Sequence, residues 1–373
     1  MALTSVGKLW AAATGERIAY IGTYTLGKSK GIYAYRFDAK TGKTTEIGLV
    51  AETPSPSFLA VHPKQRYLYA VNELSNYQGQ SAGSVSAFEI EPKTAKLRLL
   101  NTVSTKGGGP CHLTLDRTGK VLIAVNYGGG STASYQVKAD GSLSEAVTFI
   151  QHTGTVANQQ RQGGPHAHSA VMSPDNRLVM VADLGLDKIL EYKVDLISGK
   201  LTPNDPPFGT LAPASGPRHT TFSKDGHFLY AINEITCNIT AFRFDLQKGT
   251  LTEIQTIATL PADYTANNKS TAEIRLHPNG KWLYGSNRGA DTIAMFQVDT
   301  RTGKLTEGPR VPSGGRTPRG FAIDPSGTTM WVGSQGSDKL TIFKIDQKTG
   351  ALTPSGKVFD VGAPVDVLFV QLK

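Results

Sequence analysis

The chain has 373 residues, of which 18% are charged and 39% hydrophobic, with 40 glycines and 20 prolines. A composition this rich in turn residues is typical of a globular protein with many turns and little helix. The formal charge of +9 comes from lysines and arginines that are scattered rather than grouped, so we expect no nucleic-acid partner. No apolar run approaches the length of a membrane-spanning helix, so we expect no membrane partner either.

Residues 1–16 precede the first recognisable strand. The opening "MALTSVGKLWAAATGERIAYIG" has an early lysine but lacks the apolar core of a secretory signal peptide. We therefore expect residues 1–16 to be an N-terminal extension or the remnant of a trimmed signal, followed by one domain over residues 17–373. The sequence as written predicts a cytoplasmic protein, and a periplasmic or secreted one if the extension is such a remnant.

From residue 56 onward the chain repeats one pattern. Each unit has an apolar strand, a turn of the Pro-Asp-Gly kind, and a second apolar strand that ends in Asn, Asp or Ser. The clearest copies are "PSFLAVHPKQRYLYAVNE", "PCHLTLDRTGKVLIAVNY", "HAHSAVMSPDNRLVMVADL", "PRHTTFSKDGHFLYAINE", "EIRLHPNGKWLYGSNRG" and "PRGFAIDPSGTTMWVGSQ". A third alternating strand follows each copy, as in "GSVSAFEIE" or "DKLTIFKID", and then a turn and a fourth strand.

The spacing of these units predicts the fold class. They recur about every 50 residues, and four strands in that length are typical of one propeller blade. The N-terminal "IAYIGTYTLGKSKGIYAYRFD" begins at the second strand of a unit, whereas the C-terminal "APVDVLFVQL" supplies a first strand and stops. We therefore predict an all-β, seven-bladed β-propeller with four antiparallel strands per blade, closed by N- and C-terminal strands that share one blade. Closure leaves no free sheet edge, so we expect a monomer.

In such a ring, the beginnings of the first strands and the ends of the second strands meet around the axis, and binding residues gather on such loops. Asn72, Asn126, Asp183, Asn233 and Asn287 recur at the strand ends, and we interpret them as structural, because free backbone groups there need partners. Other axial residues depart from the repeat.

Four departures predict chemistry at the axis: His168, Arg218, Glu234 and Arg288 stand at axial strand beginnings or strand ends in three neighbouring units. Arginine and glutamate are seldom buried without partners, so their convergence would form a cationic cup with one carboxylate and one imidazole. Guanidinium groups hold anionic groups and stabilise an oxyanion, and a neutral His or a Glu takes a proton from water. This set is suited to hydrolysis of an activated ester in an acidic molecule, without a nucleophile of the GxSxG type.

We predict no metal and no cofactor. His166 and His168 are two residues apart in an extended strand, which places both on one face, but zinc needs a third ligand from His112, His219 or Asp183. The carboxylate-rich cup that calcium needs is missing from the axial positions. The two cysteines, Cys111 and Cys237, have no metal-binding spacing, and free thiols are favoured over a bridge.

The chain resembles the lactonase family of seven-bladed β-propellers, which includes 6-phosphogluconolactonases and carboxy-cis,cis-muconate cyclases. The resemblance covers residues 17–373 and rests on "YIGTYT", "PHAHSAVMSPD", "GPRHTTF", "LYAINE", "LYGSNRGADTI" and "TPRGFAIDPSG", which occur in the family's order and spacing.

The resemblance implies a metal-independent hydrolase of a sugar δ-lactone, an anionic small molecule, with 6-phosphogluconolactone as the default substrate. It implies His168, Arg218, Glu234 and Arg288 as catalytic residues, with Glu234 or His168 as the base for water and the two arginines at the carbonyl. Further candidates for substrate binding are His112, His166, Arg275, Arg319, Glu73 and Gln335.

Three alternatives stay open. An exported lactonase would act on aldonolactones without a phosphate. A muconate-type cyclase would use a similar cup to close a lactone by adding a carboxylate across a double bond. A non-enzymatic propeller would only bind proteins or sugars, although such a ring usually has an apolar or aromatic face, whereas these axial positions are polar and charged.

Overall fold

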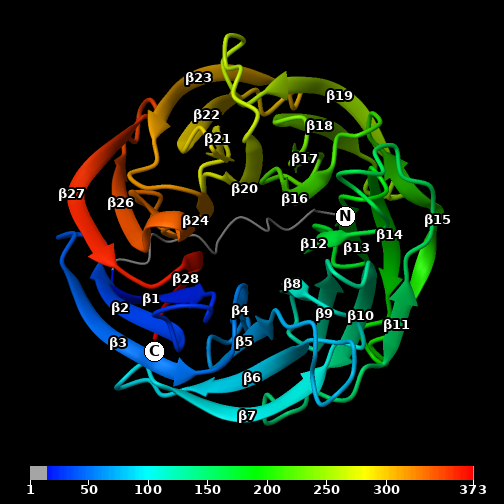
Figure 1. The fold of residues 1–373 in the computed structure, drawn as a ribbon, viewed down its shortest axis with the longest axis horizontal. Coiled ribbons are helices and arrows are strands. Elements are labelled where there is room, and N and C mark those ends of the chain that lie inside the picture. The colour runs from blue at the N-terminus through cyan, green and yellow to red at the C-terminus, as the bar shows by residue number, and fades with distance from the viewer. Residues whose placement is uncertain (1–14, 373) are drawn as a thin grey trace, which may run out of the picture.

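The computed structural model describes residues 15–372, which form seven four-stranded antiparallel sheets around a central axis (Figure 1). The sheets radiate from the axis as blades, which confirms the predicted seven-bladed propeller. The only helical segment among these residues is one 3-10 turn, η1 (Gln335–Ser337). Most of the expected N-terminal extension, residues 1–14, lies outside the described residues, and the described chain enters β1 at Glu16.

Each blade uses its four strands in the same order from the axis outward (Figure 1). The innermost strands are β4 (Leu59–Val61), β8 (Pro110–Leu115), β12 (Ala167–Met172), β16 (Pro217–Phe222), β20 (Ser270–Leu276), β24 (Pro318–Ile323) and β28 (Pro364–Val370). The second strands are β1 (Glu16–Thr23), β5 (Tyr67–Asn72), β9 (Val121–Asn126), β13 (Leu178–Asp183), β17 (Phe228–Asn233), β21 (Trp282–Arg288) and β25 (Thr329–Ser334). The third strands are β2 (Gly31–Asp38), β6 (Ser84–Ile90), β10 (Ser131–Gln136), β14 (Lys188–Val194), β18 (Asn238–Phe244), β22 (Thr292–Val298) and β26 (Lys339–Ile345). The outermost strands are β3 (Thr44–Glu52), β7 (Leu97–Ser104), β11 (Thr148–Gln151), β15 (Leu201–Thr210), β19 (Leu251–Ala258), β23 (Leu305–Pro312) and β27 (Leu352–Asp360).

One blade joins the two ends of the chain, as the sequence predicts. Its strand order is β28-β1-β2-β3, and β1 pairs antiparallel with β28 from Ile18 opposite Val370 to Thr23 opposite Pro364. The ring is thus closed by backbone hydrogen bonds between segments at opposite ends of the sequence.

The turns between innermost and second strands need a residue in the left-handed backbone region. Gly119 and Gly226 fill this position with φ of 73° and 78°. At Gly119 a Cβ atom would lie 2.2 Å from His62 Nε2, so a side chain does not fit there.

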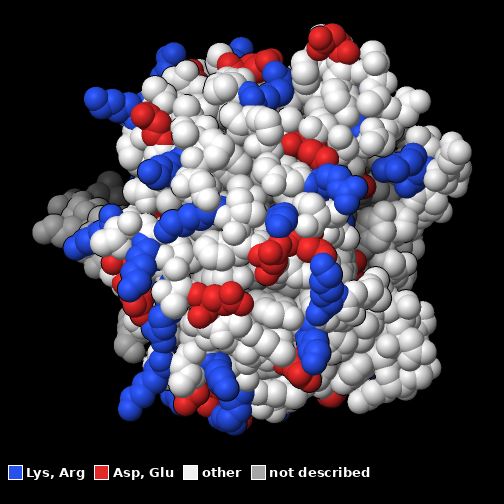
Figure 2. All heavy atoms as spheres, turned by 60° about the vertical axis from the view of Figure 1, so that its left-hand side comes forward, with Lys and Arg blue, Asp and Glu red and all other residues white. Residues whose placement is uncertain are grey.

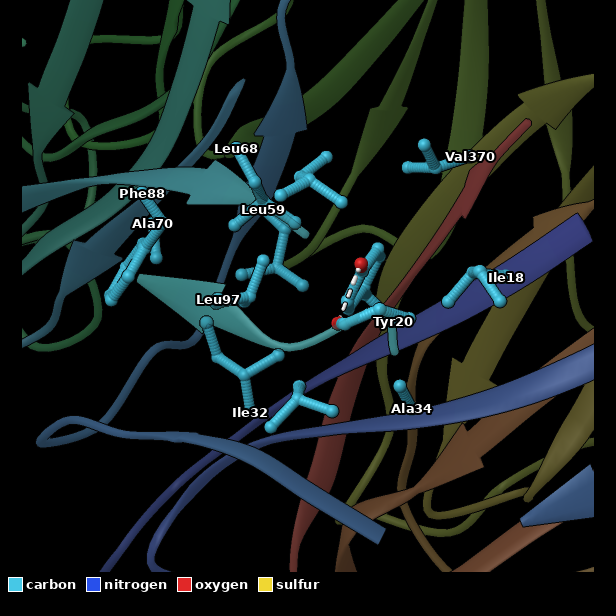
Figure 3. Close-up of a cluster of buried hydrophobic side chains, with 13 residues drawn as sticks. Ile18, Tyr20, Ile32, Ala34, Leu59, Leu68, Ala70, Phe88, Leu97 and Val370 are labelled. Atoms are coloured by element: carbon cyan, nitrogen blue, oxygen red, sulfur yellow. Dashed lines mark hydrogen bonds between the residues drawn. The ribbon is translucent and has the colours of Figure 1, made fainter. Parts of the chain in front are cut away.

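Apolar side chains are buried between neighbouring blades. Figure 3 shows the cluster between the closing blade and the next one, where Ile18 and Tyr20 of β1 face Leu68 and Phe88. The Tyr20 hydroxyl donates to the Ala95 carbonyl at 2.9 Å, so the buried phenol is satisfied. Equivalent clusters lie between the other neighbouring blades, and the burial of this apolar surface holds the ring together.

The outer surface carries charges of both signs. On the face around β26 and β27, Figure 2 shows lysines and arginines interspersed with aspartates and glutamates rather than gathered in one basic patch. Within residues 15–372, no helix is long and apolar enough to cross a membrane.

Candidate active site

Five innermost strands carry a β-bulge directly after their first paired residue. In β28 the extra residue is the apolar Val365. In the other four strands the register shifts between Pro110 and His112 in β8, between Ala167 and Ser169 in β12, between Pro217 and His219 in β16, and between Pro318 and Gly320 in β24. A bulge leaves one extra residue unpaired and redirects its side chain. The extra residues of these four strands are Cys111, His168, Arg218 and Arg319. We call this end of the axis the bulge end, and the opposite end, where innermost and second strands are joined, the turn end.

At the bulge end, three of the four predicted catalytic residues contact one another. Oε2 of Glu234, which follows β17, accepts from Arg218 Nε at 3.0 Å and lies 2.7 Å from Nη2 of Arg288, the last residue of β21. The Arg161 guanidinium approaches Oε1 of the same carboxylate at 3.6 Å. We call these four residues the Glu234 cluster. Arg218 is also held by the Ala272 carbonyl, which accepts from its Nη1 at 2.7 Å.

The Glu234 cluster holds more positive than negative charge. Burial lowers the pKa of Arg218 to about 10, and the nearby Arg319 and Arg288 cations act in the same direction. Burial alone would raise the pKa of Glu234, but the guanidinium groups of Arg288, Arg218 and Arg319 hold it below its ordinary value. The carboxylate is therefore ionised at neutral pH, and the surrounding cations are not fully neutralised by it.

The fourth predicted residue, His168, lies beside this cluster. Its side chain is buried, its Nδ1 lies 3.6 Å from Cys111 Sγ, and its ring meets the Tyr127 ring edge-on at 5.2 Å. Burial and then the positive charge of Arg218 hold the pKa of His168 well below its ordinary value. The imidazole is therefore neutral at neutral pH and has a lone pair for a proton.

Arg319 and Glu73, both predicted to bind substrate, form a second group at the bulge end. Glu73 Oε2 accepts from the Tyr24 hydroxyl at 2.8 Å and from Ser57 Oγ at 2.5 Å, and the Arg319 guanidinium lies over the Tyr24 ring at 5.3 Å. Burial opposes the charge of Arg319, but Tyr24, Glu73 and Glu234 raise its pKa above the ordinary value. Arg319 therefore contributes positive charge between Glu73 and the Glu234 cluster.

His166 and Gln335, also predicted to bind substrate, have their described contacts outside the Glu234 cluster. The His166 ring stacks on Tyr127 with centroids 4.4 Å apart, and its Nδ1 donates to the Tyr127 carbonyl at 2.8 Å. The Gln335 backbone donates to the Thr317 carbonyl at 3.0 Å, and its side chain makes no hydrogen bond to any of residues 15–372. Neither contacts the Glu234 cluster directly, and their roles in binding stay predictions.

The structure does not bring His112 and Arg275 into the Glu234 cluster. Both line a cavity at the turn end, because they stand further along their innermost strands, where each residue advances by about 3.3 Å. The His112 ring stacks on Phe58 at 3.8 Å, and Arg275 Nη2 lies 3.3 Å from Glu273 Oε2. The sequence pattern places them near the axis but does not distinguish its two ends.

The His219–Glu273 pair and Arg161 are contacts of the axis that the sequence pattern did not predict. His219 Nδ1 donates to Glu273 Oε1 at 3.1 Å, and both side chains are buried. Burial opposes the charge of Glu273, but Arg275 and His219 lower its pKa to about 2, and burial lowers the pKa of His219 to about 4. His219 and Glu273 each stand near the beginning of an innermost strand. The repeat therefore predicted that they lie near the axis, but it did not predict that they pair with each other. Arg161 lies in a loop outside the repeat, so no signal was available for it.

The residues interpreted as structural are hydrogen-bonded within the blades. The Asn72 side chain donates to Thr53 Oγ1 at 2.8 Å and accepts from Ser86 Oγ at 2.7 Å. Asp183 Oδ1 accepts from the backbone of His166 at 2.8 Å, and Oδ2 lies 2.7 Å from His152 Nδ1. These two side chains hold groups of the adjoining strands and loops, as expected of structural residues.

Histidine, cysteine, aspartate and glutamate are the candidate metal ligands in the described part of the chain. No three histidine, cysteine, aspartate or glutamate side chains of residues 15–372 are grouped to hold a metal ion. Cys111 and Cys237 are both free and buried. Burial raises the pKa of the Cys111 thiol, so it is protonated at neutral pH.

Comparison with known proteins places this geometry in context. The family model described as "Lactonase, 7-bladed beta-propeller" matches residues 18–369. A Bacillus subtilis protein named 6-phosphogluconolactonase is 34% identical over 82% of this chain and 85% of its own length, and a Formosa agariphila protein of the same name is 33% identical over 82% and 86%. A solved structure of a periplasmic gluconolactonase from Pseudomonas aeruginosa is 33% identical, covers 96% of this chain and 100% of its own, and has a TM-score of 0.90.

Proposed function

This chain belongs to the family of seven-bladed β-propeller lactonases, and from that premise we propose that it hydrolyses the ring ester of a sugar δ-lactone at the Glu234 cluster. One observation carries the proposal. A single carboxylate is shared by the guanidinium groups of Arg218 and Arg288, at 3.0 and 2.7 Å, beside the neutral imidazole of His168. The positive charge of the guanidinium groups exceeds the negative charge of the one carboxylate. This excess can bind an anionic substrate and stabilise an oxyanion as it forms.

The proposed reaction needs one water molecule and no covalent intermediate. The water oxygen adds to the lactone carbonyl carbon, and the carbonyl oxygen becomes an oxyanion that Arg218 and Arg288 stabilise. The base takes the proton of the water and returns it to the ring oxygen when the ester bond breaks. The product is an acid with one new hydroxyl group. Each step uses a group of this chain, so we propose that no metal ion takes part.

Glu234 and His168 are the two candidate bases. Both are unprotonated at neutral pH because the pKa of each lies below its ordinary value. The two are separated by Glu234→Gln and His168→Asn, measured by turnover under saturating substrate. Loss of the base costs about 100- to 10,000-fold in kcat. Full turnover in Glu234→Gln would assign the base to His168.

For the substrate we propose 6-phosphogluconolactone, because several arginines adjoin the bulge end and relatives carry that activity in their names. A second candidate is a lactone without phosphate, favoured by the similarity to the periplasmic gluconolactonase. The experiment is hydrolysis of glucono-δ-lactone and of its 6-phosphate, each corrected for spontaneous hydrolysis, with and without EDTA. We expect preference for the phosphate and no effect of EDTA.

The other outcomes of this experiment are informative. Equal or better turnover of the neutral lactone would favour the second candidate. Loss of activity with EDTA would contradict the metal-free mechanism. No turnover of either lactone would leave a lactone cyclase or a non-enzymatic binding propeller.

Arg161 offers a finer test of the phosphate preference. It is more than half exposed, with 53% of its side chain accessible, and reaches Glu234 from a loop outside the repeat. We expect Arg161→Gln to raise KM for the 6-phosphate by about tenfold through loss of one charge-assisted contact, with little change for the neutral lactone. An equal effect on both substrates would mean that Arg161 acts on Glu234 rather than on the phosphate. Arg117→Gln, at the turn end, serves as the matched control.

A further inference from the structure

A cavity of about 540 Å³ opens at the turn end of the axis, away from the Glu234 cluster. It is lined by the later residues of the innermost strands and by the turns that follow them, including Pro63, Asp116, Pro278 and Pro325. The bulges that carry His168 and Arg218 lie at the first residues of the same strands. The two ends of the axis therefore offer different side chains to solvent.

The register shows why this end is hollow. Each innermost strand has one residue at the same height along the axis, because it pairs with the corresponding residue of the second strand. Thr221, for example, pairs with Tyr230, and Arg275 pairs with Tyr284. All seven line the cavity, and most are small: Ala60, Thr114, Val171, Thr221, Arg275, Ala322 and Leu368. Arg275 is the one charged residue of this set. Small side chains around one arginine leave open space in front of its guanidinium.

The Arg275 side chain is held but not enclosed. Its Nη2 lies 3.3 Å from Glu273 Oε2, its guanidinium is 6.0 Å from the centre of the Phe58 ring, and 36% of the side chain is exposed. Thr220 and Thr221 line the same cavity, and the Thr220 hydroxyl is buried without a hydrogen-bond partner among residues 15–372. The guanidinium is therefore pre-oriented by Glu273 and still has donors to offer.

The remaining wall of the cavity is mainly aliphatic. It includes Val61, Leu276, Ile323 and Val367 beside the small residues already named. Asp366 lies at the same cavity, but it is almost fully buried, and its Oδ2 accepts from the Leu59 backbone at 2.8 Å. The Arg275 guanidinium stands inside the cavity, and a second arginine, Arg117, lies at its exposed rim. A site with an inner guanidinium, nearby hydroxyls and apolar walls recognises a carboxylate that carries a small apolar body.

Packed rings separate this cavity from the Glu234 cluster. Phe58 stacks on His112 at 3.8 Å, His112 meets His219 edge-on at 5.1 Å, and His219 meets His168 at 5.3 Å. Phe58 and His112 line the cavity, whereas His168 belongs to the bulge end. A ligand at the turn end would thus occupy a place distinct from the proposed lactone site.

We propose that the cavity at the turn end is a second ligand site, which binds small aliphatic monocarboxylates through the Arg275 guanidinium. The carboxylate would pair with the free edge of the guanidinium, and the alkyl chain would lie against the aliphatic wall. This proposal does not depend on lactone hydrolysis, because it concerns the other end of the axis.

The test is calorimetric titration of the full chain with acetate, butyrate, hexanoate and hexanol. We expect hexanoate to bind more tightly than acetate, by about fourfold for each methylene group that the wall covers. Hexanol, which lacks the charge, should bind at least about tenfold more weakly than hexanoate. Equal binding of hexanol and hexanoate would overturn the role of the guanidinium, and no binding of any of the four would overturn the site.

Variants locate the binding. We expect Arg275→Gln to lower hexanoate affinity by about tenfold or more, and Arg275→Lys to retain part of it, because lysine keeps the charge beside Glu273 but lacks the planar fork. Arg117→Gln, which removes an exposed arginine at the rim of the same cavity, should weaken hexanoate binding less than Arg275→Gln does. Arg288→Gln, in the Glu234 cluster, should leave hexanoate binding unchanged. Unchanged binding in both Arg275 variants, or loss in Arg288→Gln, would overturn the proposal. Circular dichroism of each variant checks that the ring is folded.

Discussion

Two arginine–carboxylate contacts in this ring differ in the balance between positive and negative charge. Asp324 is fully buried and accepts from Arg17 Nη1 at 3.0 Å, and three backbone N–H groups of the following turn also donate to its two oxygens. In the Glu234 cluster, three guanidinium groups share one carboxylate whose side chain is 13% exposed. Arg288 Nε there is buried without a partner among residues 15–372.

This difference is the one expected between a structural contact and the contact that we propose to be functional. Arg17 and Asp324 match one charge with one charge and connect β1 with the turn after β24, in neighbouring blades. The Glu234 cluster leaves positive charge and a donor unmatched beside a partly open carboxylate. An excess of one charge lowers stability unless another group supplies its partner, so such an excess points to a ligand.

The largest expected effect is on stability, from Arg17→Met. Removal of one partner leaves the Asp324 carboxylate buried without its cation, which costs about 3–5 kcal/mol in the free energy of unfolding. Chemical denaturation measures this change, and kcat/KM at room temperature should stay close to that of the parent. An unchanged unfolding midpoint would mean that the backbone donors alone satisfy Asp324.

The next effect is on activity, from Arg288→Gln. Loss of one donor to the oxyanion should lower kcat/KM for the preferred lactone by about 100- to 1,000-fold. The melting temperature should change little, because the remaining arginines still neutralise Glu234. Arg66→Gln is the matched control: it removes an exposed arginine that also pairs with a glutamate, Glu89, at 2.8 Å, and should alter neither quantity. A large loss of stability with normal activity in Arg288→Gln would place this arginine with Arg17 as a structural residue.

The smallest expected effect is the response of kcat/KM to pH between about 6 and 8. The pKa of His168 lies well below 6.5 and the pKa of Glu234 lies below 4.5, so both groups are already unprotonated in this range. Activity should be lost only as pH falls through these lowered values, where either base would gain a proton. The measurement is kcat/KM against pH with subtraction of spontaneous hydrolysis. A fall in activity centred near pH 6.5 would indicate an ordinary histidine as the base.

Much of the fold was predictable because it repeats. A turn of the Pro-Asp-Gly kind between two apolar strands recurs along the chain, and each copy supports the interpretation of the others. Closure of the ring also followed from sequence, since the first and last segments are complementary parts of one blade, and β28 pairs with β1 as predicted. Arg218, Glu234 and Arg288 were found in the same way, as charged residues at positions where a repeat needs none.

The end of the axis at which a residue lies was harder to predict. His112 immediately follows Cys111 at the bulge, and Arg275 is two residues beyond Glu273, yet both line the cavity at the turn end. A bulge adds one residue to a strand without adding a partner, so positions that look equivalent by counting differ in height and direction. Arg161 could not be found by counting at all, because a loop outside the repeat carries it to Glu234.

The sequence by itself therefore determined the period of the repeat, the number of blades, the closing blade and the residues that face the axis. These depend on local alternation and turn chemistry, which each unit repeats. Only the tertiary structure decided which axial charges meet: that Arg161 joins Arg218 and Arg288 on Glu234, that Glu273 pairs with His219, and that Arg275 stands alone among small residues. Those contacts join different blades or loops, and the distances between them are set by ring closure and by the bulges rather than by separation along the chain.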